Sequence, residues 1–80
     1  MKILLSRHAA EALELRAIDL AWIEETLVSP DWTEPDPRPD RTRSFKAIAA
    51  FGDRVLRVVH RPAGGGAMVI TVHFDRGARR

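Results

Sequence analysis

Histidine and arginine side chains in the second half of this sequence have the chemistry to cleave a phosphodiester without a metal ion. Such cleavage of RNA needs a base for the 2′-hydroxyl, a cation for the charge on the phosphorane, and an acid for the leaving oxygen. A histidine near its working pKa, with arginine and lysine beside it, can supply all three. The strand pattern described below places His73, Arg57 and Lys46 together. The alternative is an ordinary solvated strand face, on which such residues are common.

His8 is a second candidate for proton transfer, and Arg7 lies beside it. Ser6 is a good N-cap, which makes His8 the second helical residue. The partial positive charge at a helix N-terminus favours anionic neighbours. The residue could bind phosphate or exchange protons. In a structural role, it could instead bond a backbone carbonyl where the helix meets the sheet.

The remaining histidine, His60, falls on the buried side of the strand pattern, where we expect a structural role. The three histidines lie on different predicted elements without i, i+4 spacing, and the sequence has no cysteine. No zinc site is therefore predicted, and no cofactor. Gly64-Gly65-Gly66 joins two strands and does not open a helix, which is typical of a hairpin connection rather than a phosphate-binding loop.

Three runs of alternating residues, 43–51, 54–61 and 67–75, position these side chains. Turn residues separate them, at Gly52-Asp53 and at 62–66. Alternation of this kind predicts an antiparallel meander with one buried face. The residues predicted to face the core are Phe45, Ala47, Ala49 and Phe51 in the first run, and Met68, Ile70, Val72 and Phe74 in the third.

The Gly52-Asp53 dipeptide predicts the register of the meander. A two-residue loop led by glycine suits a type II′ hairpin, which would place Phe51 opposite Arg54 and Phe45 opposite His60. In the last pair of strands we expect Val55 to face His73 and Arg57 to face Thr71. The exposed sheet face is then a mixed basic surface that includes Lys46, Arg57, Arg61 and His73.

The first part of the chain predicts one short strand and two helices. Residues 2–5 are apolar and strand-like, and a helix is expected from Arg7 to about Leu15. Asp19 is a second N-cap, and the spacing of Ile18 and Ile23 fits a hydrophobic staple. The second helix should end near Val28 or Ser29, because a proline follows.

The segment 29–42 holds four of the five prolines and is predicted to be an extended loop. Long loops in small domains are either functional or flexible. Trp32 indicates that the start of this one is held against the body of the protein. Residues 76–80 form a basic tail that we expect to be frayed.

Eighty residues with 45% hydrophobic content predict one domain, spanning 1–80. The expected order is β-α-α-β-β-β. Two helices covering one face of an antiparallel sheet make a two-layer α+β fold. No apolar run approaches the ~18 residues of a membrane span, and the start is too short for a signal peptide, so the expected location is the cytoplasm.

The net charge of +2 conceals a strong asymmetry. Residues 1–40 carry four lysines and arginines against nine carboxylates, a net charge of −5, whereas residues 41–80 carry nine against two, a net charge of +7. Such a division either provides a surface for an anion or lets the two halves complement each other.

Four motifs resemble a small bacterial domain family that is grouped with BrnT- and RelE/ParE-type toxins. They are His8-Ala9-x-x-x-Leu13-x-x-Arg16-Ala17-Ile18, Ser29-Pro30-Asp31-Trp32-x-Glu34-Pro35-Asp36-Pro37, Leu56-Arg57-Val58-Val59 and Val69-Ile70-Thr71-Val72-x-Phe74-Asp75-Arg76. The sequence departs from the family pattern at Ala12, where arginine is usual, and at Ala17, where glycine is usual. The resemblance implies a RelE-like fold and a toxin-type activity.

Two functions are consistent with this resemblance. One is a metal-independent endoribonuclease with His73, Arg57, Lys46 and His8 as candidate catalytic residues. Its candidate RNA-binding residues are Arg7, Arg43, Lys46, Arg57, Arg61 and Arg76. The other is a non-catalytic module that binds a protein, either an antitoxin or a target. The exposed face is expected to include Ile48, Val55, Val59 and Val69 among its charges, and a terminal strand could also accept pairing.

Overall fold

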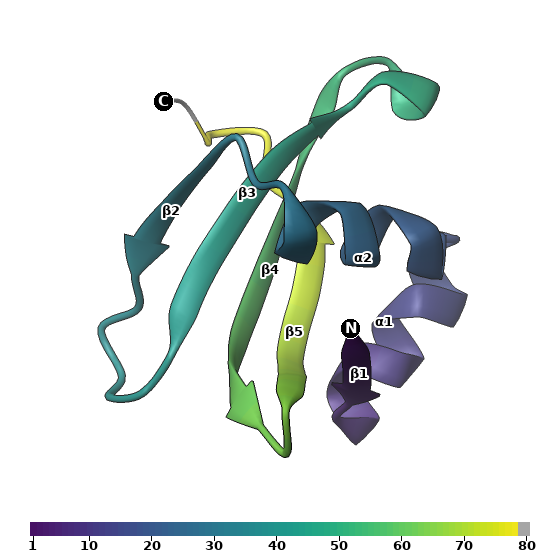
Figure 1. Ribbon diagram of the computed structural model, residues 1–80. Coiled ribbons are helices and arrows are strands. Elements are labelled where there is room, and N and C mark those ends of the chain that lie inside the picture. Colours follow the sequence, from purple (N-terminus) through teal and green to yellow (C-terminus); the bar gives the residue numbers. More distant parts are fainter. Residues whose placement is uncertain (79–80) are drawn as a thin grey trace.

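Two helices cover one face of a five-stranded sheet in the computed structural model, which describes residues 1–78 (Figure 1). The elements are β1 (Lys2–Leu5), α1 (Arg7–Arg16), α2 (Leu20–Val28), β2 (Trp32–Pro35), β3 (Thr42–Ile48), a 3₁₀ turn (Ala49–Phe51), β4 (Arg54–Ala63) and β5 (Gly66–Phe74). The strand order is β1-β5-β4-β3-β2. The predicted α+β fold is confirmed, as are the N-caps Ser6 and Asp19.

The sheet has one strand more than expected and is mixed. β2 lies inside the segment predicted to be a loop and pairs antiparallel with β3, so that Trp32 lies opposite Phe45. Their rings stack with centroids 4.7 Å apart, which holds the start of this segment against the sheet as the tryptophan indicated. β1 pairs parallel with β5 at the other edge.

The chain after β5 makes a turn as far as the structure describes it. The N–H of Gly77 donates to Asp75 Oδ1 at 3.0 Å, and the N–H of Ala78 donates to the Asp75 carbonyl at 3.3 Å. The predicted frayed tail also includes Arg79 and Arg80, which lie outside the described residues.

The core lies between the helices and the sheet. Its fully buried aliphatic side chains are Ile23, Leu56, Val58, Val69 and Val72, joined by Ile18 and Ile48. Each such side chain contributes on the order of 2 kcal/mol through its removal from water. α2 packs across β3 and β4, and α1 packs along β5.

The β3–β4 connection differs from the predicted two-residue hairpin. Ala49–Phe51 forms a 3₁₀ turn, Gly52 follows with a left-handed φ of 65°, and Ile48 rather than Phe51 pairs with Arg54. Alanines favour helical over extended backbone, so Ala49 and Ala50 leave the strand. The predicted register is therefore wrong by three residues.

This odd-numbered slip turns β3 over, because alternate strand residues point to opposite faces. Phe45 and Ala47 lie on the face away from the helices, whereas Ile48 enters the core. Phe51 contacts Trp22 and Phe74, with ring centroids 5.7 and 4.7 Å apart, from its position in the turn.

β5 contains a bulge that the alternation pattern did not predict. Val59 pairs with Thr71 but His60 pairs with Val69, so Ile70 is the extra residue. Because of the bulge, the side chains in the first half of β5 point to the faces opposite to those predicted. Val69 is fully buried, and Met68 and Ile70 do not belong to the buried core cluster.

Ser6 ties this bulge to α1. Its hydroxyl donates to the Ile70 carbonyl at 2.7 Å and accepts from the Ala9 N–H at 3.0 Å, and its own N–H donates to the Val69 carbonyl at 2.9 Å. One residue thus caps the helix and fixes the position of its first turn relative to the sheet.

α1 ends at Ala17, which has the left-handed angles φ 52° and ψ 43°. Glycine reaches these angles without the Cβ clash that alanine suffers, so the backbone at this position favours glycine.

We predict that Ala17→Gly stabilises the protein by about 0.5–1 kcal/mol, because relief of left-handed strain exceeds the entropy that glycine adds to the unfolded chain. Chemical denaturation measures the change. The matched control is Ala10→Gly at an exposed position inside α1, which should cost about 1 kcal/mol. Equal destabilisation by both changes would contradict the strain argument.

We predict that Ser6→Ala costs about 2 kcal/mol, since the variant loses the N-cap and leaves the part-buried Ile70 carbonyl without its hydroxyl donor. The comparison is Asp19→Ala, which removes only the cap of α2, a bond of 2.9 Å from the Ala21 N–H, and should cost about 1 kcal/mol. If the two losses in the free energy of unfolding are equal, the Ser6–Ile70 bond contributes nothing.

Candidate functional site

The sheet face away from the helices, here called the open face, brings the two central catalytic candidates together. Arg57 of β4 lies directly opposite His73 of β5. The expected partners were Val55 for His73 and Thr71 for Arg57, so the observed register differs by two residues. An even shift keeps the same face, and it makes Arg57 and His73 adjacent cross-strand neighbours.

Lys46 does not belong to this group. It pairs with Leu56 and lies on the helix side of the sheet, because of the slip in the β3–β4 register. Its ammonium donates to the Ser29 carbonyl at 2.8 Å at the end of α2 and lies 3.6 Å from Asp31. A cation there stabilises the helix C-terminus, so its role is structural. The prediction that Lys46 shares a face with His73 is wrong.

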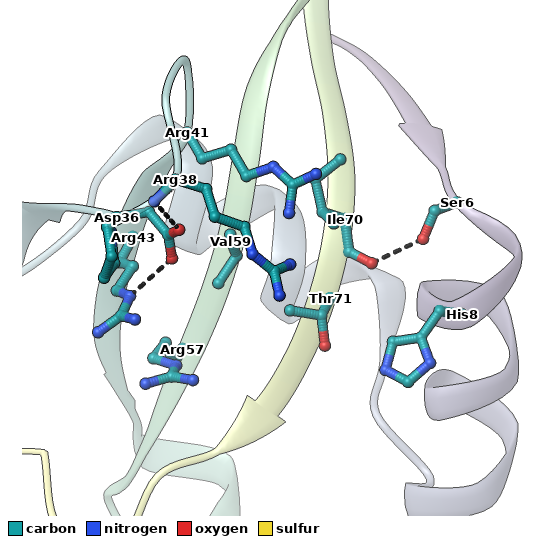
Figure 2. Close-up of a pocket in the computed structure, with 11 residues that line it drawn as sticks. Ser6, His8, Asp36, Arg38, Arg41, Arg43, Arg57, Val59, Ile70 and Thr71 are labelled. Atoms are coloured by element: carbon teal, nitrogen blue, oxygen red, sulfur yellow. Dashed lines mark hydrogen bonds and ion pairs between the residues drawn. The ribbon is translucent and has the colours of Figure 1, made fainter.

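A cavity of about 650 Å³ opens on the open face between α1 and the loop that joins β2 to β3 (Figure 2). It is lined by Ser6, His8, Asp36, Pro37, Arg38, Arg41, Arg43, Arg57, Val59, Ile70 and Thr71. We call it the arginine pocket. Val59 is buried, and Figure 2 shows it with Thr71 between the loop arginines and His8.

Four guanidinium groups and one carboxylate line the arginine pocket. Arg43 Nε donates to Asp36 Oδ2 at 2.9 Å, and Arg57 donates to Asp75 Oδ2 at 3.4 Å. The Nε of Arg57 is buried and has no hydrogen-bond partner among the described residues. The pocket therefore has an excess of positive charge, as expected for an anion site.

The other two guanidiniums, of Arg38 and Arg41, make no ion pair or side-chain hydrogen bond among residues 1–78. Figure 2 shows both reaching from the loop over β4 and β5, toward Thr71 and Ile70. Neither these two arginines nor Asp36 was predicted from the sequence as a site residue. The available signal was the Asp36-Pro37-Arg38-Pro39 spacing, since alternate prolines stiffen a loop that carries charge.

His8 enters the arginine pocket from the first turn of α1 and faces Thr71 (Figure 2). The bonds that Ser6 makes to the β5 bulge place it there. His73 lies two residues beyond Thr71 on the same face of β5, so the two histidines flank one stretch of strand. The structure thus brings His8, Arg57, Arg43 and His73 to one region.

Burial lowers the pKa of His73, and the neighbouring Arg57 lowers it further, against a smaller opposing effect of Asp75. The imidazole is therefore neutral near pH 7, the form in which it can accept a proton. His60 pairs with Thr42 rather than Phe45, and Nε2 lies 2.7 Å from the Ser44 hydroxyl, in agreement with a structural role. Burial lowers its pKa also.

Three other predicted RNA-binding residues lie outside the arginine pocket. Arg7 is highly exposed and pairs with Glu11 at 3.5 Å. Arg61 lines a separate hollow with Arg41 beside the β2–β3 loop. Arg76 lies beside Arg54 in a hollow near the β3–β4 turn.

Metal and membrane features are absent from the part of the chain that the structure describes. Within residues 1–78, no three His, Cys, Asp or Glu side chains gather where they could hold a metal ion. In the same range, no helix has the length and apolar character needed to cross a lipid bilayer.

One protein-family model matches the chain, over residues 5–74, and it describes a domain of unknown function, DUF4258. The chain belongs to this family. The match includes both helices and all of β2, β3, β4 and β5. No curated protein and no solved structure gives a significant match.

We predict that the protein loses stability as the pH falls below about 6.5, the ordinary value of an unfolded histidine. His60 and His73 have lowered folded pKa values, so below that pH the unfolded chain binds more protons and is favoured. Above pH 7 both histidines are neutral in the folded and in the unfolded state, so their titration no longer changes the stability. Thermal unfolding between pH 7.5 and 5.5 measures it. A His60→Gln, His73→Gln double variant should show a shallower slope, and an unchanged slope would contradict the assignment.

Proposed function

We propose that this protein is a RelE-like cytoplasmic endoribonuclease that cleaves RNA without a metal ion at the open face of its sheet. The observation that carries the proposal is the direct cross-strand pairing of Arg57 with His73, beside the pocket that His8 enters from α1. This arrangement supplies one cation and two proton-transfer groups around a site with excess positive charge.

RNA is the polyanion that best fits these groups. Guanidinium forks bind phosphate oxygens through two parallel hydrogen bonds, and Arg43 and Arg57 present theirs on the same sheet face. The buried Nε of Arg57 is a donor that still needs an acceptor. That nitrogen has no accessible surface, so a phosphate would instead bind the terminal amino groups of Arg57, whose side chain is 23% exposed.

In the proposed reaction, His73 accepts the proton of the 2′-hydroxyl as O2′ attacks the adjacent phosphorus. Arg57 stabilises the charge on the phosphorane. The bond from phosphorus to the 5′-oxygen then breaks, and His8 donates a proton to that oxygen. The products are a 2′,3′-cyclic phosphate and a free 5′-hydroxyl, and each histidine ends in the protonation state opposite to its starting one.

The outer edge of β1 favours the second candidate function, a module that binds a protein. β1 is an edge strand, and Leu4 within it is 37% exposed. A backbone edge with an exposed aliphatic side chain can accept a strand from a partner such as an antitoxin. This surface lies on a different part of the molecule from the arginine pocket.

We predict that the wild type cleaves single-stranded RNA in the presence of EDTA, and that His73→Ala lowers kcat by about 100-fold or more. Arg57→Ala should lower kcat similarly, since it removes the phosphorane cation. Lys46→Ala is the matched control: it also removes one positive charge, but from the helix side of the sheet, and should leave kcat unchanged. Gel analysis of end-labelled RNA measures the rates and identifies the cyclic phosphate product.

Absence of cleavage by the wild type, or equal cleavage by the wild type and the His73→Ala, Arg57→Ala double variant, would refute the mechanism. Salt dependence separates the two candidate functions. Binding to phosphate weakens steeply as salt rises, whereas pairing with a protein strand through apolar contacts does not.

A further inference from the structure

The β2–β3 loop is folded around one carboxylate, that of Asp36. Its Oδ1 accepts the N–H of Arg38 at 2.9 Å, and its Oδ2 accepts Nε of Arg43 at 2.9 Å. The N–H of Asp36 donates to the Arg41 carbonyl at 3.1 Å, which closes the loop. The Asp36 side chain is only 9% exposed. Arg38 and the Arg43 guanidinium lower the pKa of this carboxyl, so it is ionised throughout the neutral range.

The sequence of the loop limits its freedom further. Pro37 and Pro39 flank Arg38 and fix φ at their own positions. Asp40 has a left-handed φ of 66°, which aspartate tolerates better than most residues. The conformation of the loop is therefore set before any ligand binds, and little ordering is needed on binding.

The loop directs into the arginine pocket two cations whose guanidiniums make no ion pair or hydrogen bond among residues 1–78. Arg38 and Arg41 extend over the open face, and Arg43 is paired with Asp36 (Figure 2). Arg57 is paired with Asp75. Clustered guanidiniums repel one another, and nothing among residues 1–78 offsets the charge of these two by direct contact. An anion between them would do so.

We propose that Arg38 and Arg41 form a phosphate subsite, held in place by Asp36, for the nucleotide next to the one that is cleaved. The inference rests on the proposed function, because it takes the phosphate at Arg57 to be the reacting one. Arg38 and Arg41 act in binding and Asp36 is a positioning residue. A substrate must then supply at least two successive phosphates to fill the pocket.

A substitution of Asp36 tests this proposal, because a purely electrostatic role and a positioning role predict opposite changes in the affinity for a polyanion. If Asp36 only contributed negative charge, Asp36→Asn would strengthen the binding of a polyanion to the pocket. If Asp36 holds the loop, the same change weakens binding, because asparagine has one acceptor oxygen in place of two and can keep only one of the bonds from the Arg38 N–H and the Arg43 Nε. Asp40→Asn removes an equal charge from the same loop, and asparagine also tolerates the left-handed backbone.

The experiment uses the full chain and a fluorescent single-stranded oligodeoxynucleotide, which has no 2′-hydroxyl and is not cleaved. Anisotropy gives Kd over a range of salt concentrations. We expect Asp36→Asn to raise Kd by about 10-fold, the loss of one or two charge-assisted bonds, while Asp40→Asn leaves Kd equal or lower. The Arg38→Ala, Arg41→Ala variant should raise Kd and reduce the salt slope by about 1.4, two phosphate contacts at ~0.7 each.

Cleavage kinetics separate the subsite from the catalytic pair. With RNA as substrate, the Arg38→Ala, Arg41→Ala variant should show a raised KM and unchanged kcat, whereas Arg57→Ala lowers kcat. Thermal unfolding checks that each variant is folded. The double arginine variant is informative even if Asp36→Asn is unstable, because these two side chains make no ion pair or side-chain hydrogen bond in the described part of the chain, residues 1–78.

The outcomes distinguish the two proposals. If the wild type binds neither oligonucleotide nor RNA, the proposed function fails and the subsite with it. If the wild type binds and cleaves RNA, but the arginine variant keeps its KM or a folded Asp36→Asn binds as tightly as Asp40→Asn, the subsite is refuted and the proposed function stands.

Discussion

The hydrogen bond from the Ser6 hydroxyl to the Ile70 carbonyl links the features on which the site depends. It joins the N-cap of α1 to the bulge in β5. The bulge lets β5 present Val69 to the core on one side of the irregularity and Val72 on the other. The cap positions the first turn of the helix, and His8 with it. This contact adds to the packing of α1 on β5 and fixes where His8 stands relative to the open face.

The distribution of charge follows from the same architecture. The acidic half of the sequence supplies both helices, and the basic half supplies β3, β4 and β5. The pocket combines the two halves, since Arg38 and Asp36 come from the acidic half and Arg43 and Arg57 from the basic half. The carboxylates of Asp36 and Asp75 form ion pairs with Arg43 and Arg57. Net charge alone therefore does not describe the site; the distinction between paired and unpaired guanidiniums does.

Local signals predicted local structure well. Ser6 and Asp19 marked both helix starts, Pro30 marked the end of α2, and the alternation found β3, β4 and β5. Which face of the sheet each β3 side chain occupies could not be predicted. It depends on whether Ala49 and Ala50 continue the strand or enter a 3₁₀ turn. The turn is stabilised by contacts of Phe51 with Trp22 and Phe74, which are distant in sequence.

The candidate site was predicted in the same uneven way. Arg57 and His73 were placed on one face correctly, because an error of two residues in register preserves facing. Lys46 was misplaced, because an error of three does not. Arg38 and Arg41 carried no periodic signal at all. Their position depends on the hydrogen bonds that Asp36 accepts from Arg38 and Arg43. The secondary-structure propensities of single residues do not predict such bonds across a turn.

The pairing of β1 with β5 also constrains when the site can exist. Lys2 lies beside Gly66, and Ser6 bonds a carbonyl 64 residues further along the chain. During synthesis, the first strand has no partner until nearly all of the matched region has been made. Closing a loop of this length costs chain entropy, and contacts between residues so distant in sequence slow folding. A partial translation product that ends before β5 would carry His8 and Arg57 but would lack Ile70 and Thr71, and with them one wall of the arginine pocket.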